Sequence, residues 1–226
     1  MKSRLFKESA DSPKVSGSAA FSLIELLVVL AIAGIMAALT IPALSGLQSA
    51  GSVNRAVSGI SLLLNQSRSY AMAHGTYVWV GFAPDTTTER LTIGVVAGTT
   101  GQADDLSSPS TYTPINKLQY FEHFNLPNVN SLSTVAGVAA NGDDIRAAAY
   151  SPSPLGSFTQ AGGRGPVKFT TLLQYNPQGE ATLKSNGASH WIQIGLQPVR
   201  GTSWTGSNVA VLQVATLTGR VQICRP

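Results

Sequence analysis

The sequence contains a single cysteine, Cys224, and few charged residues. One cysteine cannot form a disulfide within the chain, which excludes the small exported domains that rely on internal disulfides. Charged residues make up only 12% of the sequence, whereas glycine is abundant, with 22 residues. This composition is typical of an exported, loop-rich β domain rather than of a soluble cytosolic enzyme.

Motifs for catalysis and for metal binding are also lacking. The three histidines are far apart in the sequence, and none belongs to a His-Glu-x-x-His or paired-cysteine pattern. The chain has no Gly-x-Ser-x-Gly elbow, no P-loop and no dinucleotide-binding glycine pattern. We therefore expect no metal, no cofactor and no enzymatic activity. A membrane-tethered hydrolase is the enzymatic alternative, and an activity screen of Ser and His variants would test it.

Basic residues are only slightly in excess. The net charge is +4, but the first 20 residues hold four basic and two acidic side chains, so residues 21–226 keep a net charge of +2. Phosphate contacts need clustered Lys or Arg side chains. Nucleic acid is therefore an unlikely partner on charge alone.

One carboxylate, Glu25, lies in an otherwise apolar run from Phe21 to Ile41. A helix of about 20 apolar residues can cross a bilayer, so the run predicts a transmembrane and assembly helix over residues 21–42. An ionised Glu in lipid costs roughly 2.5–3.5 kcal/mol at a helix centre and needs a partner. Cleavage before Phe21 would create an α-amino group one helical turn from Glu25, or next to the Glu25 of a neighbouring subunit.

This stretch resembles the prepilin-type cleavage and methylation signal of type IV pilins and type II secretion pseudopilins. The shared pattern is a short basic leader, a small residue, Phe, three residues, Glu and an apolar helix. The resemblance implies that a prepilin peptidase removes residues 1–20 after Ala20 and methylates the amine of Phe21, and that Glu25 directs assembly. The family nearly always has Gly before the cut, where this chain has Ala20. The implied partners are other pilin or pseudopilin subunits, the peptidase, the inner-membrane assembly platform and membrane lipid.

Other interpretations of the N-terminus remain. One is an ordinary signal peptide that is cut near residues 48–50. Another is a plain single-span anchor in which Glu25 lies at the membrane surface and contacts water. A signal-peptide core has 7–15 apolar residues, whereas this run is longer and contains Glu25. In both membrane interpretations the basic leader stays in the cytoplasm. We expect a single-pass protein of the bacterial inner membrane with a periplasmic head, associated with a filament after assembly.

The predicted fold class is α+β, with a long N-terminal α-helix packed on a mainly antiparallel β-sheet head. Apolar residues recur at three- and four-residue spacing after Pro42, which should loosen the helix without ending it. This pattern predicts an amphipathic continuation over residues 43–75 that ends at His74-Gly75. The remaining residues, 76–226, form the predicted β-rich pseudopilin head.

The head contains both strand and loop patterns. Alternating or β-branched runs predict strands over residues 77–82, 91–96, 167–170, 181–183, 191–196, 209–214 and 220–223. The first two are expected to form a hairpin across residues 84–90. Residues 117–124 are a weaker strand candidate, residues 143–150 a short helix or strand, and residues 97–116 and 152–166 long loops.

The helix end and first strand are similar to those of minor pseudopilins of the GspH and FimT type. Arg68 and Ala71 stand in matching places, and Asn176-Pro177-Gln178-Gly179 resembles the Pro-x-Gly turn of that group. A further likeness is to the pilin-like proteins of Verru_Chthon gene cassettes. The resemblance implies a structural minor pilin or pseudopilin.

A FimT-like minor pilin that binds DNA during uptake is the alternative. Its candidate contacts are Arg220 and Arg225, which flank the last predicted strand. Gln222 stands where another arginine would strengthen this interpretation. A charged, solvated strand edge explains the same two residues.

Overall fold

The structure, a computed structural model, describes residues 22–132, 134–150, 152–184, 189–200, 203–204 and 208–226. The chain divides into two compact units, residues 1–45 and 46–226. Helix α1 (Leu23–His74) contributes to both units and continues past Pro42, as predicted. The predicted leader lies outside the described residues.

The second half of α1 is amphipathic. Its buried side chains follow the predicted three- and four-residue spacing: Val53, Val57, Ile60, Leu64 and Ala71. The intervening residues Asn54, Arg55, Ser58 and Asn65 are exposed. The helix stops as predicted, because Gly75 adopts φ +60° and the Thr76 amide donates to the Ala71 carbonyl at 3.1 Å.

The first sheet of the head is antiparallel, with strand order β10-β9-β1-β2-β3 and with β4 also paired to β2. The predicted hairpin is confirmed, because β1 and β2 pair from Val78 opposite Ala97 to Asp85 opposite Arg90. The strands are β1 (Val78–Asp85), β2 (Arg90–Gly98), β3 (Tyr112–Pro114), β4 (Gln119–Glu122), β9 (Thr171–Tyr175) and β10 (Ala181–Thr182).

The second sheet has the order β12-β11-β13-β14, with β5 and β6 also paired to β11. Only β6 among its described strands runs parallel to its neighbour. The strands are β5 (Phe124–Asn125), β6 (Gly142–Asp144), β11 (Trp191–Arg200), β12 (Ser203–Trp204), β13 (Ala210–Ala215) and β14 (Val221–Cys224). Two short 3₁₀ helices, η1 (Asp105–Ser107) and η2 (Val129–Ser131), lie in the loops.

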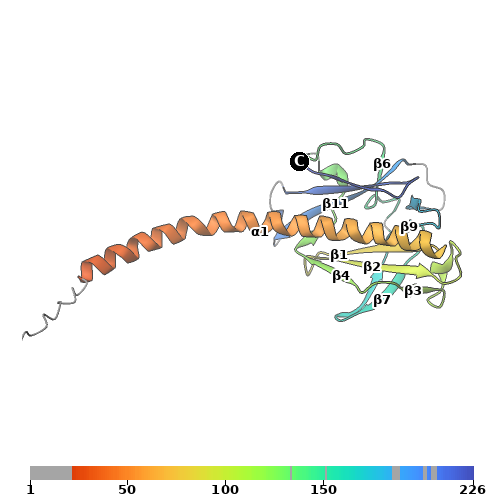
Figure 1. The fold of residues 1–226 in the computed structure, drawn as a ribbon, viewed down its shortest axis with the longest axis horizontal. Coiled ribbons are helices and arrows are strands. Elements are labelled where there is room, and N and C mark those ends of the chain that lie inside the picture. Colours follow the sequence, from red (N-terminus) through yellow and green to blue (C-terminus); the bar gives the residue numbers. More distant parts are fainter. Residues whose placement is uncertain (1–21, 133, 151, 185–188, 201–202, 205–207) are drawn as a thin grey trace, which may run out of the picture. The chain divides into compact units, whose positions relative to one another are not determined.

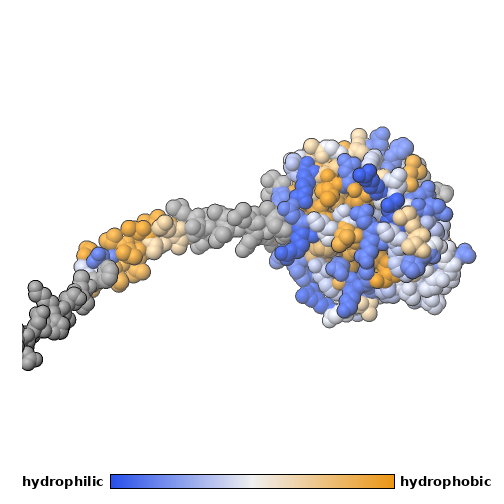
Figure 2. Space-filling model, viewed as in Figure 1, coloured by the Kyte–Doolittle hydropathy of each residue, from blue (hydrophilic) through white to orange (hydrophobic). Residues whose placement is uncertain are grey.

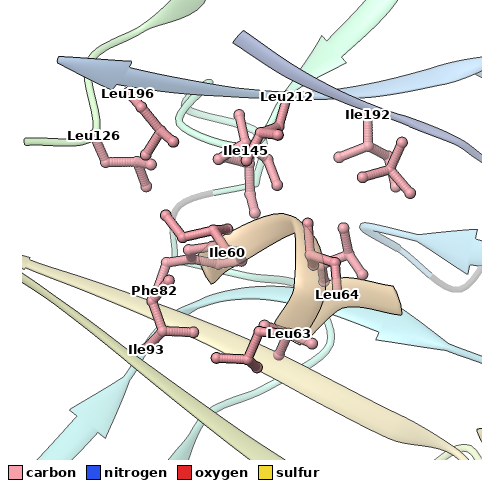
Figure 3. Close-up of a cluster of buried hydrophobic side chains, with 14 of the residues drawn as sticks. Ile60, Leu63, Leu64, Phe82, Ile93, Leu126, Ile145, Ile192, Leu196 and Leu212 are labelled. Carbon is pink, nitrogen blue, oxygen red and sulfur yellow. The ribbon is translucent and has the colours of Figure 1, made fainter. Parts of the chain in front are cut away.

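The half of α1 that belongs to the head lies between these two sheets (Figure 1). Side chains alternate along each strand, so one face of each sheet meets the helix. In Figure 3, Ile60 lies near Phe82 of the first sheet, and Leu196 and Leu212 extend toward the helix from the second. One continuous apolar core therefore joins the helix to both sheets, and the predicted α+β fold class is confirmed.

A hairpin of β7 (Phe158–Gly162) and β8 (Gly165–Phe169) covers the outer face of the first sheet. The rings of Phe158 and Phe169 stack with their centroids 4.8 Å apart. They pack over Gly81 of β1 and Gly94 of β2, which lie opposite each other. A Cβ on Gly81 would lie 2.6 Å from the Cβ of Phe169, so the two glycines make room for the aromatic pair.

Cys224 lies on the outer face of the second sheet, in an apolar cluster with Val129, Leu132 and Val135. Its thiol is within 3.4 Å of the Gln213 side-chain oxygen and 3.5 Å of the Gly137 carbonyl oxygen. Burial raises the pKa of this thiol. Both faces of the second sheet are therefore covered.

Several strand predictions were wrong. Residues 152–166 are not one loop, because they contain β7 and the start of β8, and residues 97–116 contain β3 and η1. The strand predicted at residues 167–170 corresponds to the end of β8, whereas β9, which follows it, was not predicted. All five residues of β9 are buried, so its sequence lacks the alternation of a half-exposed strand. The candidate strand at residues 117–124 is interrupted at His123, which has φ +61°.

We expect Gly81→Ala to destabilise the head by about 1–3 kcal/mol, because the added methyl group must displace the backbone-proximal atoms of Phe169. Urea unfolding followed by tryptophan fluorescence measures this change. Gly163→Ala is the matched control, because a Cβ there meets no atom within 4 Å, and its effect should stay within about 0.5 kcal/mol. Equal stability of the two variants would contradict the proposed role of Gly81.

Candidate assembly segment and the turns that dock on α1

The first turn of α1 contains Glu25. The amides of Glu25 and Leu26 donate to the carbonyl of Ser22, at 3.0 and 3.2 Å, so the helix begins directly after this serine. The positive end of the helix dipole favours a carboxylate in this turn. Glu25 has no ion-pair partner among the residues that the structure describes, so its charge is free to pair with a group from outside them.

The surface of residues 22–38 is apolar on all sides. Every side chain in this range is exposed, and Glu25 is its one ionisable residue. The large apolar side chains are between 48% (Val28) and 81% (Leu23) exposed, and Figure 2 shows this surface on the face in view. An amphipathic helix would bury one face, whereas a helix that is apolar all round needs lipid or other helices around it.

Among the described residues, no helix combines the length and the apolar character that a membrane crossing requires. The predicted transmembrane segment, residues 21–42, is therefore not confirmed. Ala20 and Phe21, the predicted cleavage and methylation residues, lie outside the described residues. Their assignment remains a prediction.

The two candidate DNA contacts lie at opposite ends of β14. Arg220 precedes the strand and Arg225 follows it, which separates their Cα atoms by about 17 Å in an extended chain. Both residues are exposed, and Arg225 Nη1 donates to the side-chain oxygen of Asn54 on α1. The structure therefore does not bring the two arginines together.

Arg68 connects α1 to two turns of the head. Its Nε donates to the carbonyl oxygen of Gly179 at 3.3 Å, and a Cβ on Gly219 would lie 2.7 Å from its Cδ. Both glycines have positive φ, +83° and +62°. The predicted turn before β10 is confirmed, because the Gly179 amide donates to the Asn176 carbonyl at 2.9 Å. The sequence predicts the turn at Gly179, but no local pattern predicts its contact with Arg68.

Tyr175, the last residue of β9, lies near this arginine. Its side chain is fully buried, and its hydroxyl has no hydrogen-bond partner among the described residues. Burial raises the pKa of Tyr175 well above its ordinary value, and the nearby positive charge of Arg68 opposes that rise. The neutral phenol is therefore the form that the folded head requires.

Metal chemistry has no candidate site in the described part of the chain. No three His, Cys, Asp or Glu side chains are grouped there so that they could hold an ion. The functional candidates are therefore the N-terminal segment and surfaces of the head.

Residues 16–41 match the family model of the prokaryotic N-terminal methylation motif. The match confirms the type IV pilin-like signal that the sequence predicted, and this motif implies processing by a prepilin peptidase and assembly with other pilin subunits. The likenesses to GspH, FimT and Verru_Chthon proteins remain predictions. No curated protein and no solved structure matches the chain.

We expect Tyr175→Phe to leave stability at pH 7 unchanged, or to raise it by up to about 1 kcal/mol, because it removes an unpaired buried hydroxyl. The pKa of Tyr175 is higher in the folded head than in the unfolded chain, so the contribution of this residue to the free energy of unfolding is complete below the unfolded pKa near 10. That contribution decreases as the pH rises above 10. Urea unfolding at pH 8 and pH 10.5 should show an alkaline loss that is smaller in the variant.

Tyr112→Phe is the control for this measurement, because the hydroxyl of Tyr112 accepts a hydrogen bond from the Thr159 amide at 3.4 Å. This variant should keep the full alkaline loss. If Tyr175→Phe loses as much stability at pH 10.5 as the unchanged chain, Tyr175 does not govern the alkaline limit.

Proposed function

We propose that this chain is a structural minor pilin or pseudopilin. A prepilin peptidase cuts after Ala20 and methylates the amine of Phe21, and the N-terminal helix then joins a type II secretion pseudopilus or a type IV pilus-like filament. The observation that carries the proposal is Glu25, the sole charge on a helical segment that is apolar on all sides and lies within the methylation motif.

The energetic argument concerns the partner of this carboxylate. An ionised Glu surrounded by lipid costs roughly 2.5–3.5 kcal/mol at the helix centre, and an unpaired buried charge is strongly penalised. Residues 21 and 25 are four apart, so they lie on one face of a helix. The amine freed at Phe21, or the same amine of a neighbouring subunit, supplies a positive charge. Methylation keeps that charge, and the ion pair then sets the axial register between subunits.

The proposed setting is the bacterial inner membrane. Residues 21–42 insert as a single pass, the basic leader faces the cytoplasm and the head lies in the periplasm. The inner-membrane assembly platform would move the processed subunit into the filament. The head then contributes surfaces rather than catalysis, and we propose no enzymatic activity for it.

DNA uptake is the second candidate function. The positions of Arg220 and Arg225 do not favour it, because the two residues lie at opposite ends of β14. Filter binding of the protein to DNA over a range of salt concentrations separates the two proposals. A DNA-binding minor pilin would lose affinity steeply with salt and on replacement of both arginines.

The first test is the N-terminus of the membrane-extracted protein. We expect an intact mass and an N-terminal sequence that begin at methylated Phe21, because the resemblance to prepilins implies a cut after Ala20. Ala20→Gly should be cut at least as fully, since glycine is the usual family residue. A protein that begins near residue 51, or that retains Met1, would rule out the proposed processing.

The second test separates processing from assembly. We expect Glu25→Leu to be cut but to enter filaments at least tenfold less than the unchanged chain, because it lacks the partner of the Phe21 amine. Immunoblots of membrane and sheared-filament fractions measure both steps. Met36→Leu alters an exposed apolar residue of the same segment without changing charge, and it should assemble normally. Normal assembly of Glu25→Leu would refute the ion-pair mechanism.

A further inference from the structure

Strand β14, the last strand before the C-terminus marked in Figure 1, forms one edge of the second sheet. It pairs with β13, and no described strand pairs with its other side. The Ala215 amide donates to the Arg220 carbonyl at 2.9 Å, and the direction of the backbone groups alternates along antiparallel strands. The amides and carbonyls of Val221 and Ile223 therefore point away from β13, and no hydrogen bond joins them to another described residue. An added strand could pair with these groups.

The edge presents an exposed apolar side chain on one face and a hollow on the other. Ile223 lies opposite Leu212 of the main core, so it is on the inner face of the sheet, yet it is 43% exposed. Gln222 points to the outer face and is exposed. There it lines a hollow of about 380 Å³ together with Trp191 and Arg220. Both faces of an incoming strand would therefore meet side chains of the sheet.

Both ends of the edge carry a positive charge. Arg220 precedes β14 and Arg225 follows it, about 17 Å away in an extended chain, and both are exposed. The Arg220 side chain makes no hydrogen bond or ion pair with the described residues. Arg225 donates to the side-chain oxygen of Asn54, which is neutral and does not compensate the charge.

Few carboxylates are near enough to neutralise these arginines. The sequence after Glu180 contains no acidic residue, so β11, β12, β13 and β14 have none. Asp143 and Asp144 lie on β6, which pairs with the edge of β11 opposite β13. Glu180 accepts a hydrogen bond from the Asn176 side chain at 2.7 Å. The edge of β14 is therefore cationic without internal compensation.

We propose that the edge of β14 binds an extended segment of another protein, in which apolar and polar residues alternate and a carboxylate lies at each end. The segment would add to the sheet as an antiparallel strand, held by main-chain hydrogen bonds to Val221 and Ile223. Its apolar residues would cover Ile223, and its carboxylates would meet Arg220 and Arg225. A second copy of β14 would bring four arginines to one edge, so charge disfavours it. The inference goes beyond the proposed function and does not depend on filament assembly.

The test is an NMR titration of the ¹⁵N-labelled full chain in detergent micelles with the peptide acetyl-Glu-Thr-Val-Thr-Val-Glu-amide. In the antiparallel arrangement its third and fifth residues lie opposite Ile223 and Val221, and its two carboxylates lie opposite Arg225 and Arg220. We expect saturable shifts that are largest at the amides of Val221 and Ile223. Hydrogen exchange of these two amides should slow when the peptide is bound.

Two N-methylated peptides test the backbone pairing without changing the protein. Methylation of the third amide removes the donor to the Ile223 carbonyl and places a methyl group between the strands, so affinity should fall about tenfold. Methylation of the fourth amide, which points away from β14, should change affinity less than about twofold. Equal affinity of the two forms would show that no strand is added.

The charge requirement is tested with the peptide in which both Glu residues are Gln. At low salt its affinity should be about threefold lower than that of the Glu peptide, and the difference should shrink as salt rises. Arg220→Gln should reduce this preference for the Glu peptide. Lys117→Gln, at an exposed lysine outside the second sheet, should leave the preference unchanged. Equal losses in the two variants would contradict the assigned role of Arg220.

Two variants of one edge residue assign binding to β14. Ile223→Pro removes an amide that points away from β13, so the fold should be kept while binding is lost. Ile223→Val keeps the amide and should keep the affinity within about twofold. The proposal is overturned if the peptide does not bind, or if Ile223→Pro binds it as well as Ile223→Val. Displacement of the peptide by single-stranded DNA at a tenfold lower concentration would also overturn it and would identify a nucleic-acid site.

Discussion

Between the two sheets of the head lies the half of α1 that begins at Val53, and its apolar side chains contact strands of both sheets. Each fully buried Leu or Ile contributes about 1.5–3 kcal/mol relative to an exposed one. Among the described elements, no other helix lies on the inner face of either sheet. Loss of the helix would therefore expose both inner faces at once, so the head depends on this shared burial.

The same helix serves two environments because its sequence changes along its length. From Val53 onward, polar residues such as Asn54 and Ser58 alternate with apolar ones, so the helix has one exposed face and one buried face. From Leu26 to Ala38 no charged residue occurs, and the exposed surface is apolar in every direction. One continuous helix thus contains a segment that is buried in the head and a segment whose apolar side chains are exposed.

Patterns of short range were predictable from the sequence. The three- and four-residue spacing after Val53, the stop at Gly75 and the β1–β2 hairpin depend on neighbouring residues, and all three were predicted correctly. The strands β7 and β9 were missed. β7 lies in a stretch rich in glycine and serine, and β9 is buried on both faces, so neither shows a clear alternation.

Contacts of long range were not predictable. The approach of Arg68 to Gly179 and Gly219 joins residues more than a hundred positions apart, and no spacing rule indicates it. The methylation signal was recognisable because its residues are consecutive.

The buried position of Cys224 bears on how the head matures. Its sulfur is enclosed by Val129, Leu132 and Val135, and burial disfavours the thiolate that disulfide exchange requires. In an oxidising compartment the folded head thus offers no accessible thiol for cross-linking to another molecule. Because a single cysteine cannot pair within the chain, folding of the head requires no disulfide.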